Sequence, residues 1–559
     1  MQRSMFGLPH ARGCFALGGR RTGSEFAGAA TAAAAALSRM PASWKSASLR
    51  WRAAVCAGAF PNWVSRPLSS EKASARDGHK FKVAVIGSGP AGCYAVAALT
   101  KQIPKTQLEV DVLDELPTPF GLVRYGIAPD HQEAKAVVNQ FAQSLSQENV
   151  RFRGNVKVGV HVSVAELRSM YHAVIAAAGA QSERKIDVPG ESLHGVLSAR
   201  KFVAWYNGHP HFTKLHVPLD HRTTDVVVVG NGNVAIDVAR ILLKTPEELA
   251  RSDIAQHAWE KLSQCSVKRV HLVGRRGLAQ ASWSAKELRE IVQKLPNVRV
   301  KVNPDEIKLS DVDLEELEME ENRAKKRCTG IVQQAAAEQE SAAAEEKRLF
   351  EGEQQTVKEL HLRFLRTPVL FLPKDDDANS VGWTQFARNH LAGPPGKQRA
   401  HITTNMPAGC ETIPSTLVLV SVGYKVGTFD GLPVDTASGV IHNVKGRVKN
   451  QTGEFLPGLY VTGWMKRGSS GIVGSNRWDA EETIRCVIED LASAPLDYKA
   501  GGAALDSLLD IRGVRLVDFD SWRRIDTRES AAGAAMGKPR QKLTSLEELL
   551  HTASTDQHA

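Results

Sequence analysis

The sequence has few cysteines, and none of them stands close to another. The seven lie at positions 14, 56, 93, 265, 328, 410 and 486, so no two are within 30 residues of each other. Without a CxxC pair, the chain lacks the neighbouring thiols of a dithiol redox centre or of a sequence-local iron–sulfur or zinc site. No HExxH metal motif is present either, and we expect no resident metal. No Ser/His/Asp elbow motif for nucleophilic catalysis is present. A scattered, odd-numbered set is typical of reduced thiols in a reducing compartment.

Long hydrophobic runs are also missing. The most apolar stretch, Ala27 to Leu37, is only about 11 residues of mostly small side chains, whereas a bilayer-spanning helix needs roughly 18–20 apolar residues. We therefore expect no transmembrane segment and at most peripheral contact with a membrane.

Acidic residues are almost absent from residues 1–70, which hold nine Lys and Arg but only one acid, Glu25. The formal charge of the whole chain is +10, yet 62 of the 71 basic and 60 of the 61 acidic residues lie after position 70, a balance of +2. Nucleic-acid-binding proteins carry their basic excess on the folded body. The pI of 9.2 is therefore no argument for a nucleic-acid partner.

Residues 1–70 have the composition of a transit peptide. They are rich in Arg, Ser and Ala, and the stretch Ser43–Val55 can form a basic amphipathic helix. The strongly apolar core of a secretory signal is missing. A mitochondrial presequence is the favoured interpretation, which places the protein in the matrix or on the matrix face of the inner membrane. A plastid leader and a disordered extension without an address are the alternatives.

The body of the chain has ordinary globular composition. Its 559 residues are 42% hydrophobic and 24% charged, and this length predicts three or four domain equivalents. Short apolar runs at 82–86 and 108–113 flank a helical stretch at 93–101, as in a βαβ unit of a parallel sheet. The pattern returns with strands at 225–229 and 268–273 around a helix at 236–243. The fold class is therefore α/β with two Rossmann-like dinucleotide-binding domains.

The first glycine loop is Gly87-x-Gly89-x-x-Gly92, between a strand and a helix. In this fingerprint the first glycine makes the turn, the second lets the backbone approach a pyrophosphate, and the third lets helix and strand pack closely. The start of the helix then offers free N–H groups to the phosphates. Asp114 ends the next strand, where a carboxylate accepts hydrogen bonds from ribose hydroxyls.

The second loop, Gly230-Asn231-Gly232-Asn233-Val234-Ala235, repeats the geometry with alanine in third place. Its next strand ends in Arg275 and Arg276 instead of an acid. Two guanidinium groups at this position favour the 2′-phosphate of NADP over the free ribose of NAD, although they could also be a solvated strand end. One acid-marked and one arginine-marked loop suggest two different dinucleotides, most simply FAD and NADPH.

Several longer motifs resemble the adrenodoxin-reductase family, which comprises NADPH:ferredoxin oxidoreductases with the glutathione-reductase-like flavoprotein fold. The resemblance runs from about Lys82 to Arg540 and is interrupted near 303–400. The motifs are Pro119–His131, Tyr171–Gly179, Gly230–Arg240, Gly274–Gly277 with Lys286–Glu290, Gly463–Val473, and the tail from Arg512 to Arg540.

The resemblance implies a set of cofactor-binding residues. Residues implied to line the FAD, beside the first glycine loop, are Ala91, Asp114, Leu122, Val158, Trp464, Gly471, Ile472 and Val473. Residues implied to contact NADP are Gly230 to Val234, Arg275, Arg276, Glu287 and Gly471. Asp114 departs from the family's usual glutamate, and Ser469-Ser470 departs from a Pro-Thr/Ser pair.

Three residues are candidates for direct roles in the chemistry: His131, Asp237 and Trp464. His131, with Asp130, could shuttle protons near the flavin or form a helix N-cap. Asp237 is either structural or linked to proton transfer. Trp464 lies beside the flavin in the family, yet an aromatic at a strand end can also be part of the core.

The expected domains follow from these assignments. Residues 71–184 and 425–559 are predicted to form a discontinuous FAD-binding domain, and residues 185–424 an NADP-binding domain. The second domain includes a charged helical excursion near 303–360, which its Glu/Ala/Gln/Lys-rich composition predicts to be solvated with little core.

The expected function is electron transfer from NADPH through FAD, one electron at a time, to an acidic [2Fe-2S] ferredoxin of the adrenodoxin type. Such a partner needs a basic docking surface. The first candidate is the cluster Arg323, Lys325, Lys326 and Arg327, whose neighbouring acids could pair with it instead, and the second is Lys466 with Arg467.

Two other functions remain as alternatives. One is the flavin subunit of an amidotransferase of the glutamate-synthase type, whose relatives carry cysteine-rich motifs that are missing here. The other is a non-enzymatic flavin-binding scaffold, which reduction of a bound flavin by NADPH would exclude.

Overall fold

The computed structural model describes residues 80–295, 297–346, 357–403, 410–427, 429, 431–435, 437–493 and 497–555. The chain divides into two units, residues 1–69 and 70–559. The first unit, and with it the proposed leader, lies outside the described residues. In the part of the chain that the structure describes, we find no helix with the length and hydropathy needed to cross a bilayer.

The first sheet has seven strands in the order β19-β20-β21-β4-β1-β2-β3. The predicted βαβ unit is confirmed as β1 (Phe81–Ile86), α4 (Pro90–Gln102) and β2 (Leu108–Leu113), and β1 and β2 are parallel. Both strands are buried along almost their whole length, as expected for a sheet covered on both faces. The sheet continues with β3 (Val150–Arg153) and β4 (Ala173–Ala176). The 3-10 turn η2 (Lys105–Gln107) precedes β2, and α8 (Val164–Met170) lies between β3 and β4. The helices between β2 and β3 are α5 (Leu122–Tyr125), α6 (Gln132–Lys135) and α7 (Val137–Leu145).

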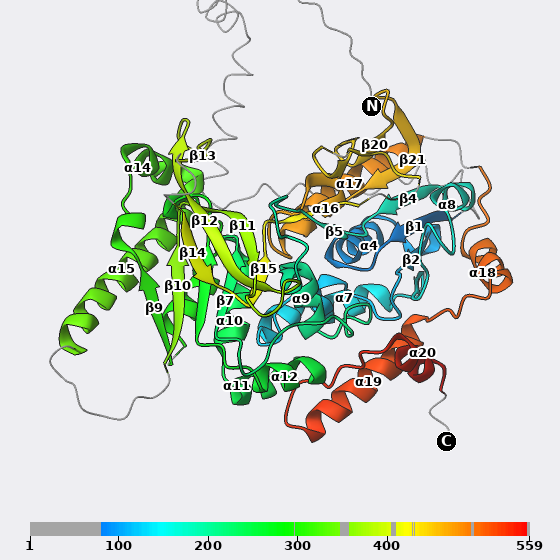
Figure 1. Ribbon diagram of the computed structural model, residues 1–559. Helices are drawn as coiled ribbons and strands as arrows, with labels where there is room; N and C mark the ends of the chain where they lie inside the picture. The colour runs from blue at the N-terminus through cyan, green and yellow to red at the C-terminus, as the bar shows by residue number, and fades with distance from the viewer. Residues whose placement is uncertain are drawn as a thin grey trace, which may run out of the picture. The chain divides into compact units, whose positions relative to one another are not determined.

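The C-terminal part of the chain returns to this sheet. Strand β21 (Phe455–Val461) pairs in parallel with β4, and α17 (Ser475–Ser493) packs on α4. Figure 1 accordingly shows the blue and cyan start of the described chain beside its orange and red end. The other elements are β17 (Val434–Asp435), β18 (Val440–Ile441), β19 (Asn443–Val444), β20 (Arg447–Lys449), α16 (Trp464–Arg467), α18 (Gly502–Ile511), α19 (Phe519–Ala535) and α20 (Leu546–Ser554). We call the seven-stranded sheet, together with these N-terminal and C-terminal elements, the first lobe.

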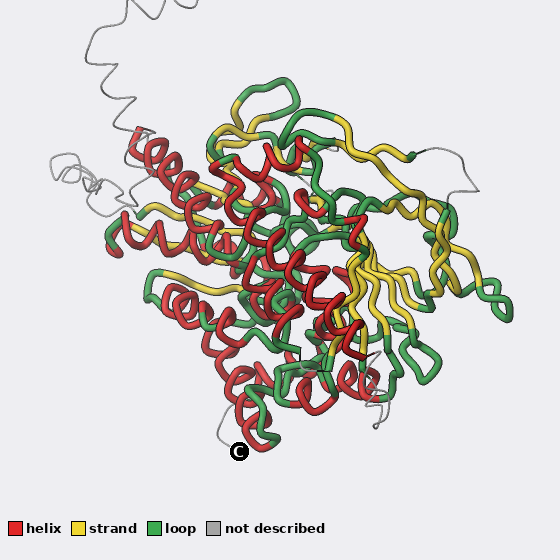
Figure 2. The backbone as a smooth tube through the Cα atoms, turned by 90° about the vertical axis from the view of Figure 1, so that its left-hand side faces the viewer, coloured by secondary structure: helices red, strands yellow, loops and turns green. Residues whose placement is uncertain are grey.

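The second lobe is built on a six-stranded parallel sheet in the order β6-β15-β7-β8-β10-β9. The second predicted βαβ unit is confirmed as β7 (Asp225–Val229), α10 (Asn233–Leu243) and β8 (Arg269–Val273). Helices lie against a twisted fan of strands in Figure 2. The other elements are β6 (Val196–Ser198), α9 (Ala199–Tyr206), α11 (Pro246–Ala250), α12 (Gln256–Ser263), η3 (Leu278–Gln280), α13 (Ala285–Gln293), β9 (Val298–Val302), η4 (Pro304–Glu306), α14 (Asp311–Glu318), η5 (Glu320–Asn322), β10 (Lys358–Arg363) and β15 (Leu417–Val420).

The charged segment after residue 303 is helical, as predicted, but it is not a solvated excursion without a core. Helix α15 (Arg323–Glu346) buries Cys328, Ile331 and Val332 in the same cluster as the strands of the sheet. It contacts β9 and is followed by β10, which pairs in parallel with β9. The helix therefore covers the sheet in a crossover. Its core-facing stripe is made of small and medium side chains, which the Glu- and Lys-rich composition obscured.

A third, antiparallel sheet lies between β10 and β15 and was not predicted. It consists of β11 (Arg366–Pro373), β12 (Val381–Ala392), β13 (Arg399–Ile402) and β14 (Glu411–Pro414), with β12 in the centre. Among the described residues, a short antiparallel pair, β5 (Ser182–Glu183) with β16 (Tyr424–Lys425), lies where the chain passes between the lobes. These two strands coincide with the boundaries that the sequence suggests near residues 184 and 425.

Candidate functional site

The first glycine loop is held by close packing at two of its three glycines. Gly87 has a φ of +104°, and a Cβ there would lie 2.6 Å from the carbonyl oxygen of Ala177. A Cβ on Gly92 would lie 1.9 Å from the carbonyl oxygen of Gly87. Glycine is therefore required at both positions by the protein itself, for the turn and for the approach of helix to strand.

Gly89 is different, because a Cβ there would meet no protein atom within 4 Å. Its backbone is extended, with φ −69° and ψ −177°, which any residue adopts. No side chain caps the start of α4, and Pro90 follows Gly89 directly. The space over Gly89 and the uncapped N–H groups of the first helical turn form a cradle that fits a pyrophosphate.

Asp114 lies at the end of β2 and ties this strand to the glycine loop. Its Oδ2 accepts hydrogen bonds from the Ser88 backbone N–H at 2.9 Å and the Ser88 hydroxyl at 2.5 Å, while its Oδ1 accepts from the Leu116 N–H at 3.0 Å. Burial raises the pKa of Asp114, and the bonds from Ser88 and Leu116 oppose this rise. The carboxylate therefore sits beside the loop, at the position where a ribose acceptor is needed.

Further residues that the resemblance implies for FAD surround the same loop. The Phe120 N–H donates to the Ser88 carbonyl, and a Cβ on Gly121 would lie 3.0 Å from the Gly89 Cα. This contact places the start of α5, with the half-exposed Leu122, next to the loop. Val158 is half-buried, two residues after Val156, whose N–H donates to the Asp114 carbonyl.

The Gly463–Val473 segment approaches the loop from the C-terminal part of the lobe. A Cβ on Gly463 would lie 2.4 Å from the Cβ of Ala91. Trp464 follows, and its ring stacks on Tyr424 with centroids 5.6 Å apart. Gly471 has a φ of +82°, Ile472 is largely exposed, and Val473 is half-buried against the core.

The second glycine loop repeats the build of the first. A Cβ on Gly230 would lie 2.2 Å from the carbonyl oxygen of Ser421, whereas a Cβ on Gly232 would meet nothing within 4 Å. The start of α10 has no side-chain cap, and Ala235 in the third position is fully buried. The open space and free N–H groups thus recur at the second loop.

The two asparagines of the second loop fix the neighbouring chain. Asn233 accepts a hydrogen bond from the Ser284 N–H at 2.7 Å, and the Asn231 carbonyl accepts from Ser282. The buried Oδ1 of Asn231 has no hydrogen-bond partner among the described residues. An unpaired buried acceptor at this edge is compatible with a donor group on a bound nucleotide. Val234 is half-buried against the core of the second lobe.

Arg275 and Arg276 follow β8, and both are exposed. The backbone carbonyls of the pair are held by the Asn389 side chain and the Leu365 N–H. Neither guanidinium forms an ion pair with a carboxylate in the described part of the chain. Desolvation of the part of the Arg276 side chain that lies against the protein, and the neighbouring charge of Arg275, lower the pKa of Arg276. Two adjacent cations without acid partners fit a phosphate group.

His131 and Asp237 meet in a charged cluster between the two lobes. His131 Nε2 lies 2.9 Å from Glu290 Oε2 and 3.5 Å from Glu287 Oε2, and its Nδ1 lies 4.0 Å from Asp237 Oδ1. His131 belongs to the first lobe, whereas the three acids are on α10 and α13 of the second. Glu287, implied for NADP, therefore lies beside the two candidates for proton transfer.

Arg240 neutralises much of this cluster. Its fully buried guanidinium donates to both oxygens of Asp130, at 2.8 and 3.0 Å, and lies 2.8 Å from Asp237. His131, Asp130 and Glu290 have the donor types of a metal site. The charges of Arg240 and Lys244, which lies 2.8 Å from Asp130, already compensate these carboxylates. We therefore interpret the cluster as a polar contact between the two lobes.

The pKa values in the cluster are shifted apart. Burial of the His131 ring opposes protonation, but the hydrogen bond with Glu290 and the negative charges of Asp130 and Asp237 together outweigh burial, so the pKa of His131 is raised. The same bond lowers the pKa of Glu290. Burial raises the pKa of Asp237 and of Glu287. Titratable groups with opposed shifts at one place are typical of functional sites.

Sequence reasoning missed three members of this region: Arg240, Glu290 and Tyr424. Burial raises the pKa of Tyr424 to about 12, and the charge of Asp237 contributes to this shift. Tyr424 thus stacks on Trp464 and also interacts electrostatically with Asp237 of the cluster. Arg240 and Glu290 lie within the motifs that carry the family resemblance, but no local pattern marks them as partners of His131. Tyr424 has no motif at all.

The two candidate docking clusters are both engaged within the chain. Lys325 lies 2.7 Å from Glu316, Lys326 2.6 Å from Glu318, and Arg323 3.6 Å from Glu320. These contacts correspond to the intramolecular alternative, although the side chains of Arg323 and Lys326 remain more than half exposed. Lys466 is buried between Asp479 and Glu482, and Arg467 donates to Asn476.

The chain matches a protein-family model and several curated proteins. The family model described as pyridine nucleotide-disulphide oxidoreductase matches residues 81–337. The mitochondrial NADPH:adrenodoxin oxidoreductase of Arabidopsis thaliana is 42% identical over 499 residues, which cover 88% of this chain and 99% of that protein. The human protein of the same name is 40% identical over 88% of this chain and 95% of its own length.

A solved structure shares the fold. Mycobacterium tuberculosis FprA, in complex with NADPH, is 37% identical and superposes with a TM-score of 0.75, covering 85% of this chain and 100% of that chain. The NADPH-ferredoxin reductase FprA of the same species is also 39% identical over 84% of this chain and 98% of its own length. The two-Rossmann α/β flavoprotein fold expected from the sequence is thereby confirmed. The chain belongs to the NADPH:adrenodoxin oxidoreductase family.

Proposed function

We propose that this protein is an FAD-dependent oxidoreductase that takes electrons from NADPH and passes them to a [2Fe-2S] ferredoxin. The observation that carries the proposal is the pair of glycine loops with the same backbone design and opposite charge at the following strand end. FAD supplies a ring that accepts a hydride and releases electrons singly. Every other task falls to the chain: binding, orientation and placement of protons.

The first loop, in this proposal, binds FAD. Gly87 and Gly92 shape the turn, Gly89 leaves room for the pyrophosphate, and Asp114 accepts from the ribose hydroxyls. Ser88 already donates twice to Asp114, which holds the carboxylate in place before any ligand arrives. The apolar side chains assigned to the lining of the site are Ala91, Leu122, Val158, Trp464, Ile472 and Val473.

The second loop binds NADPH. Gly230 and Gly232 admit the pyrophosphate, and Arg275 and Arg276 hold the 2′-phosphate through charge-assisted hydrogen bonds. We assign Glu287 and Gly471 to the nicotinamide end. Rate enhancement in such a site comes from alignment of the two reacting rings rather than from a covalent nucleophile.

His131 and Asp237 are proposed to manage protons at the place where the lobes meet. The raised pKa of His131 keeps a proton on the ring toward neutral pH. Glu290 orients this ring through Nε2. Arg240 holds Asp130 and Asp237 on the other side. Tyr424 and Trp464 form a stacked aromatic pair that supports the flavin face.

The domain assignment follows the same logic. Residues 71–184 and 425–559 are proposed to be the FAD-binding domain, and residues 185–424 the NADP-binding domain. The antiparallel pair β5–β16 marks both crossings. Residues 1–70 are proposed to be a mitochondrial leader, which the names of the relatives support because they are mitochondrial proteins. Within the mitochondrion, the proposed compartment is the matrix or the matrix face of the inner membrane.

An acidic ferredoxin is proposed to dock on the cluster Arg323, Lys325, Lys326 and Arg327, because Lys466 is buried. Replacement of Lys326 and Arg327 by Glu should raise the KM for ferredoxin about tenfold or more, since like charges across an interface cost several kcal/mol. Ferricyanide reduction should not change, and exposed Lys308→Glu is the matched control. Equal KM values for the wild type and the double variant would move the docking surface elsewhere.

The test of the function is a single assay of the full-length protein. NADPH-driven cytochrome c reduction is measured with and without added ferredoxin, alongside the absorbance of bound flavin. We expect a yellow protein whose cytochrome c rate depends on ferredoxin and is much higher with NADPH than with NADH. Reduction of the flavin without any stimulation by ferredoxin would contradict the proposed acceptor, and a colourless protein would contradict the flavin.

A further inference from the structure

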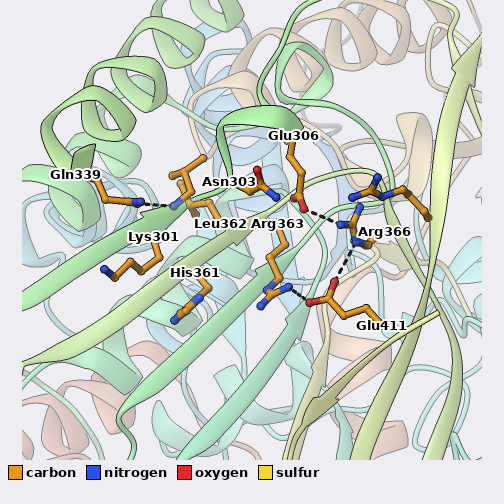
Figure 3. Close-up of a pocket in the computed structure, with 11 residues that line it drawn as sticks. Lys301, Asn303, Glu306, Gln339, His361, Leu362, Arg363, Arg366 and Glu411 are labelled. Carbon is orange, nitrogen blue, oxygen red and sulfur yellow. Dashed lines mark hydrogen bonds and ion pairs between the residues drawn. The ribbon is translucent and has the colours of Figure 1, made fainter. Parts of the chain in front are cut away.

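A cavity of about 430 Å³ opens beyond the carboxyl ends of β9 and β10. Its walls come from the last residues of these strands, from the η4 turn, and from the antiparallel sheet of the second lobe. Figure 3 shows Lys301, His361, Arg363 and Arg366 around this space. In open α/β sheets, the carboxyl edge of the strands is where ligands bind, and this volume lies within the range of small-molecule sites.

Positive charge dominates the lining. The cationic residues are Lys301, Arg363, Arg366 and Arg388, and only two acids, Glu306 and Glu411, face them. His361 also lines the cavity, and it is hydrogen-bonded to Glu359 at 2.8 Å. The local imbalance contrasts with the nearly neutral body of the chain.

Both acids are already used. Glu306 accepts from the guanidinium of Arg366 at 2.7 Å and from the Phe364 N–H at 2.8 Å. Glu411 accepts from Arg363 and, at 3.2 Å, from Arg366. Figure 3 shows the bonds of the two arginines with Glu306 and Glu411 as dashed lines. Arg366 is thereby fixed and buried, with its charge compensated, and forms a rigid wall.

Two cations in the lining are left over. Lys301 and Arg388 form no ion pair or side-chain hydrogen bond with any residue that the structure describes. The Arg363 Nε is buried and lacks a hydrogen-bond partner within the same part of the chain. Asp305, the acid near Arg388, is paired with Lys308 at 2.6 Å. Among the described residues, two cations without an ion pair and one unused donor therefore face a common space.

We propose that this cavity binds a small anion with a phosphomonoester group, at a site separate from both glycine loops. Arginine forks and lysine are the usual partners of phosphate. The cavity exceeds the size of a phosphate, so the site takes a phosphorylated small molecule rather than the bare ion alone.

The site adjoins the NADP loop without including it. The Gly274 N–H donates to the Arg363 carbonyl at 2.9 Å, and the Leu365 N–H donates to the Arg276 carbonyl at 3.2 Å. None of the residues of the second glycine loop, nor Arg275 or Arg276, lines the cavity. Because a ligand on Arg363 lies one strand away from the 2′-phosphate arginines, both ligands can be bound at once.

The test is calorimetric titration of the full-length holoprotein with glycerol 3-phosphate in low salt, both with and without saturating NADP⁺. Glycerol is the neutral control, and inorganic phosphate separates recognition of the phosphate group from that of the whole molecule. We expect glycerol 3-phosphate to bind and glycerol not to bind. Lys301→Gln and Arg388→Gln should each weaken binding about tenfold or more, because each loses a charge-assisted contact. Lys308→Gln, a neighbouring exposed lysine, should not.

Two results would overturn the proposal. One is binding that is equally strong in Lys301→Gln, Arg388→Gln and the wild type, or absent from all three. The other is binding that NADP⁺ abolishes, because the anion would then occupy the arginines of the second loop. Thermal unfolding of both variants without ligand should match the wild type, since neither side chain has an ion pair or hydrogen bond to lose among the described residues.

Discussion

The two glycine loops of this protein are nearly the same in backbone and opposite in charge. In each, the first glycine presses against the carbonyl of a neighbouring strand end, Ala177 in one and Ser421 in the other. In each, the middle glycine, Gly89 or Gly232, faces open space at the uncapped start of a helix. The difference appears only at the end of the following strand.

That difference separates the task of phosphate binding from that of cofactor choice. Backbone N–H groups and the open glycine serve any pyrophosphate, so the loop alone does not distinguish FAD from NADPH. Asp114 would repel a 2′-phosphate, whereas Arg275 and Arg276 would attract one. Specificity in this account is set by side chains about one strand away from the loop.

The largest effect is expected from Gly89→Val. The backbone at Gly89 is extended and a Cβ meets no protein atom, so the chain should fold, but the branched side chain fills the pyrophosphate space. We predict a folded, colourless protein with flavin affinity reduced at least about a hundredfold. Circular dichroism and flavin absorbance measure both properties. Gly92→Val is the contrasting variant and should fail to fold, because its Cβ overlaps the Gly87 carbonyl. A yellow Gly89→Val protein would show that FAD lies elsewhere.

The next effect tests the arginine-marked end. Replacing Arg275 and Arg276 together by Ala removes two charge-assisted contacts, and we expect NADPH binding to weaken by about 3 kcal/mol, roughly a hundredfold in Kd. NADH binding should hardly change. Kd values for both nucleotides come from titration of the oxidised protein, with exposed Arg399→Ala as the control. A double variant that keeps its preference for NADPH would place the 2′-phosphate at another site.

A smaller effect is expected from Asp114→Ala at the acid-marked end. The variant loses a ribose acceptor and also the contacts that hold Ser88. We predict that it retains FAD with affinity lowered about tenfold, which corresponds to about 1.4 kcal/mol. Flavin release during dialysis, followed by fluorescence, gives the change. Asp114→Asn is the matched variant and should lie closer to the wild type, since its amide oxygen still accepts one of the bonds.

The smallest effect concerns the contact between the lobes. Since the pKa of His131 is raised by its bond to Glu290, the stabilisation is complete below the unfolded value of about 6.5 and disappears as the pH rises through the folded pKa. The lowered pKa of Glu290 gives the opposite limit, with stabilisation lost as the pH falls below about 4.3. His131→Gln should therefore cost about 1 kcal/mol near pH 6 and less above pH 8.

Unfolding temperatures of the wild type and His131→Gln, measured across this pH range, test the prediction. His401→Gln on exposed β13 is the control and should give a difference that does not vary with pH in this way. A difference for His131→Gln that grows toward alkaline pH would mean that the ring is neutral in the folded protein.

The sequence was sufficient where the chemistry is local. Both βαβ units, the positions of the strand ends and the packing of the glycines depend on short segments whose pattern repeats in any Rossmann-like unit. The resemblance then supplied Leu122, Val158 and Trp464, which composition alone would assign to the core. The structure brings Leu122 and Ala91 to the first loop through the contacts of Gly121 and Gly463.

The sequence was insufficient where partners are distant along the chain. The His131–Glu290 pair joins residues 159 positions apart, and the Arg240–Asp130 pair joins residues 110 apart. No periodicity encodes such pairs, because they form only when the lobes meet. Helix α15 was misread because a core stripe of Cys328, Ile331 and Val332 is sparse among charged residues. The antiparallel sheet was not predicted because its strands, within residues 366–414, lie outside the motifs that carry the family resemblance.

The first loop is proposed to bind FAD and the second NADPH, and Gly232→Val tests this separation most directly. Its Cβ meets no protein atom, so the variant should fold and keep the first loop intact. Mixed with NADPH under anaerobic conditions, the protein should stay yellow, because its flavin is bound but no NADPH reaches it, while dithionite should bleach it as in the wild type. Rapid bleaching by NADPH would contradict the account, and so would a colourless variant, because FAD would then depend on the second loop.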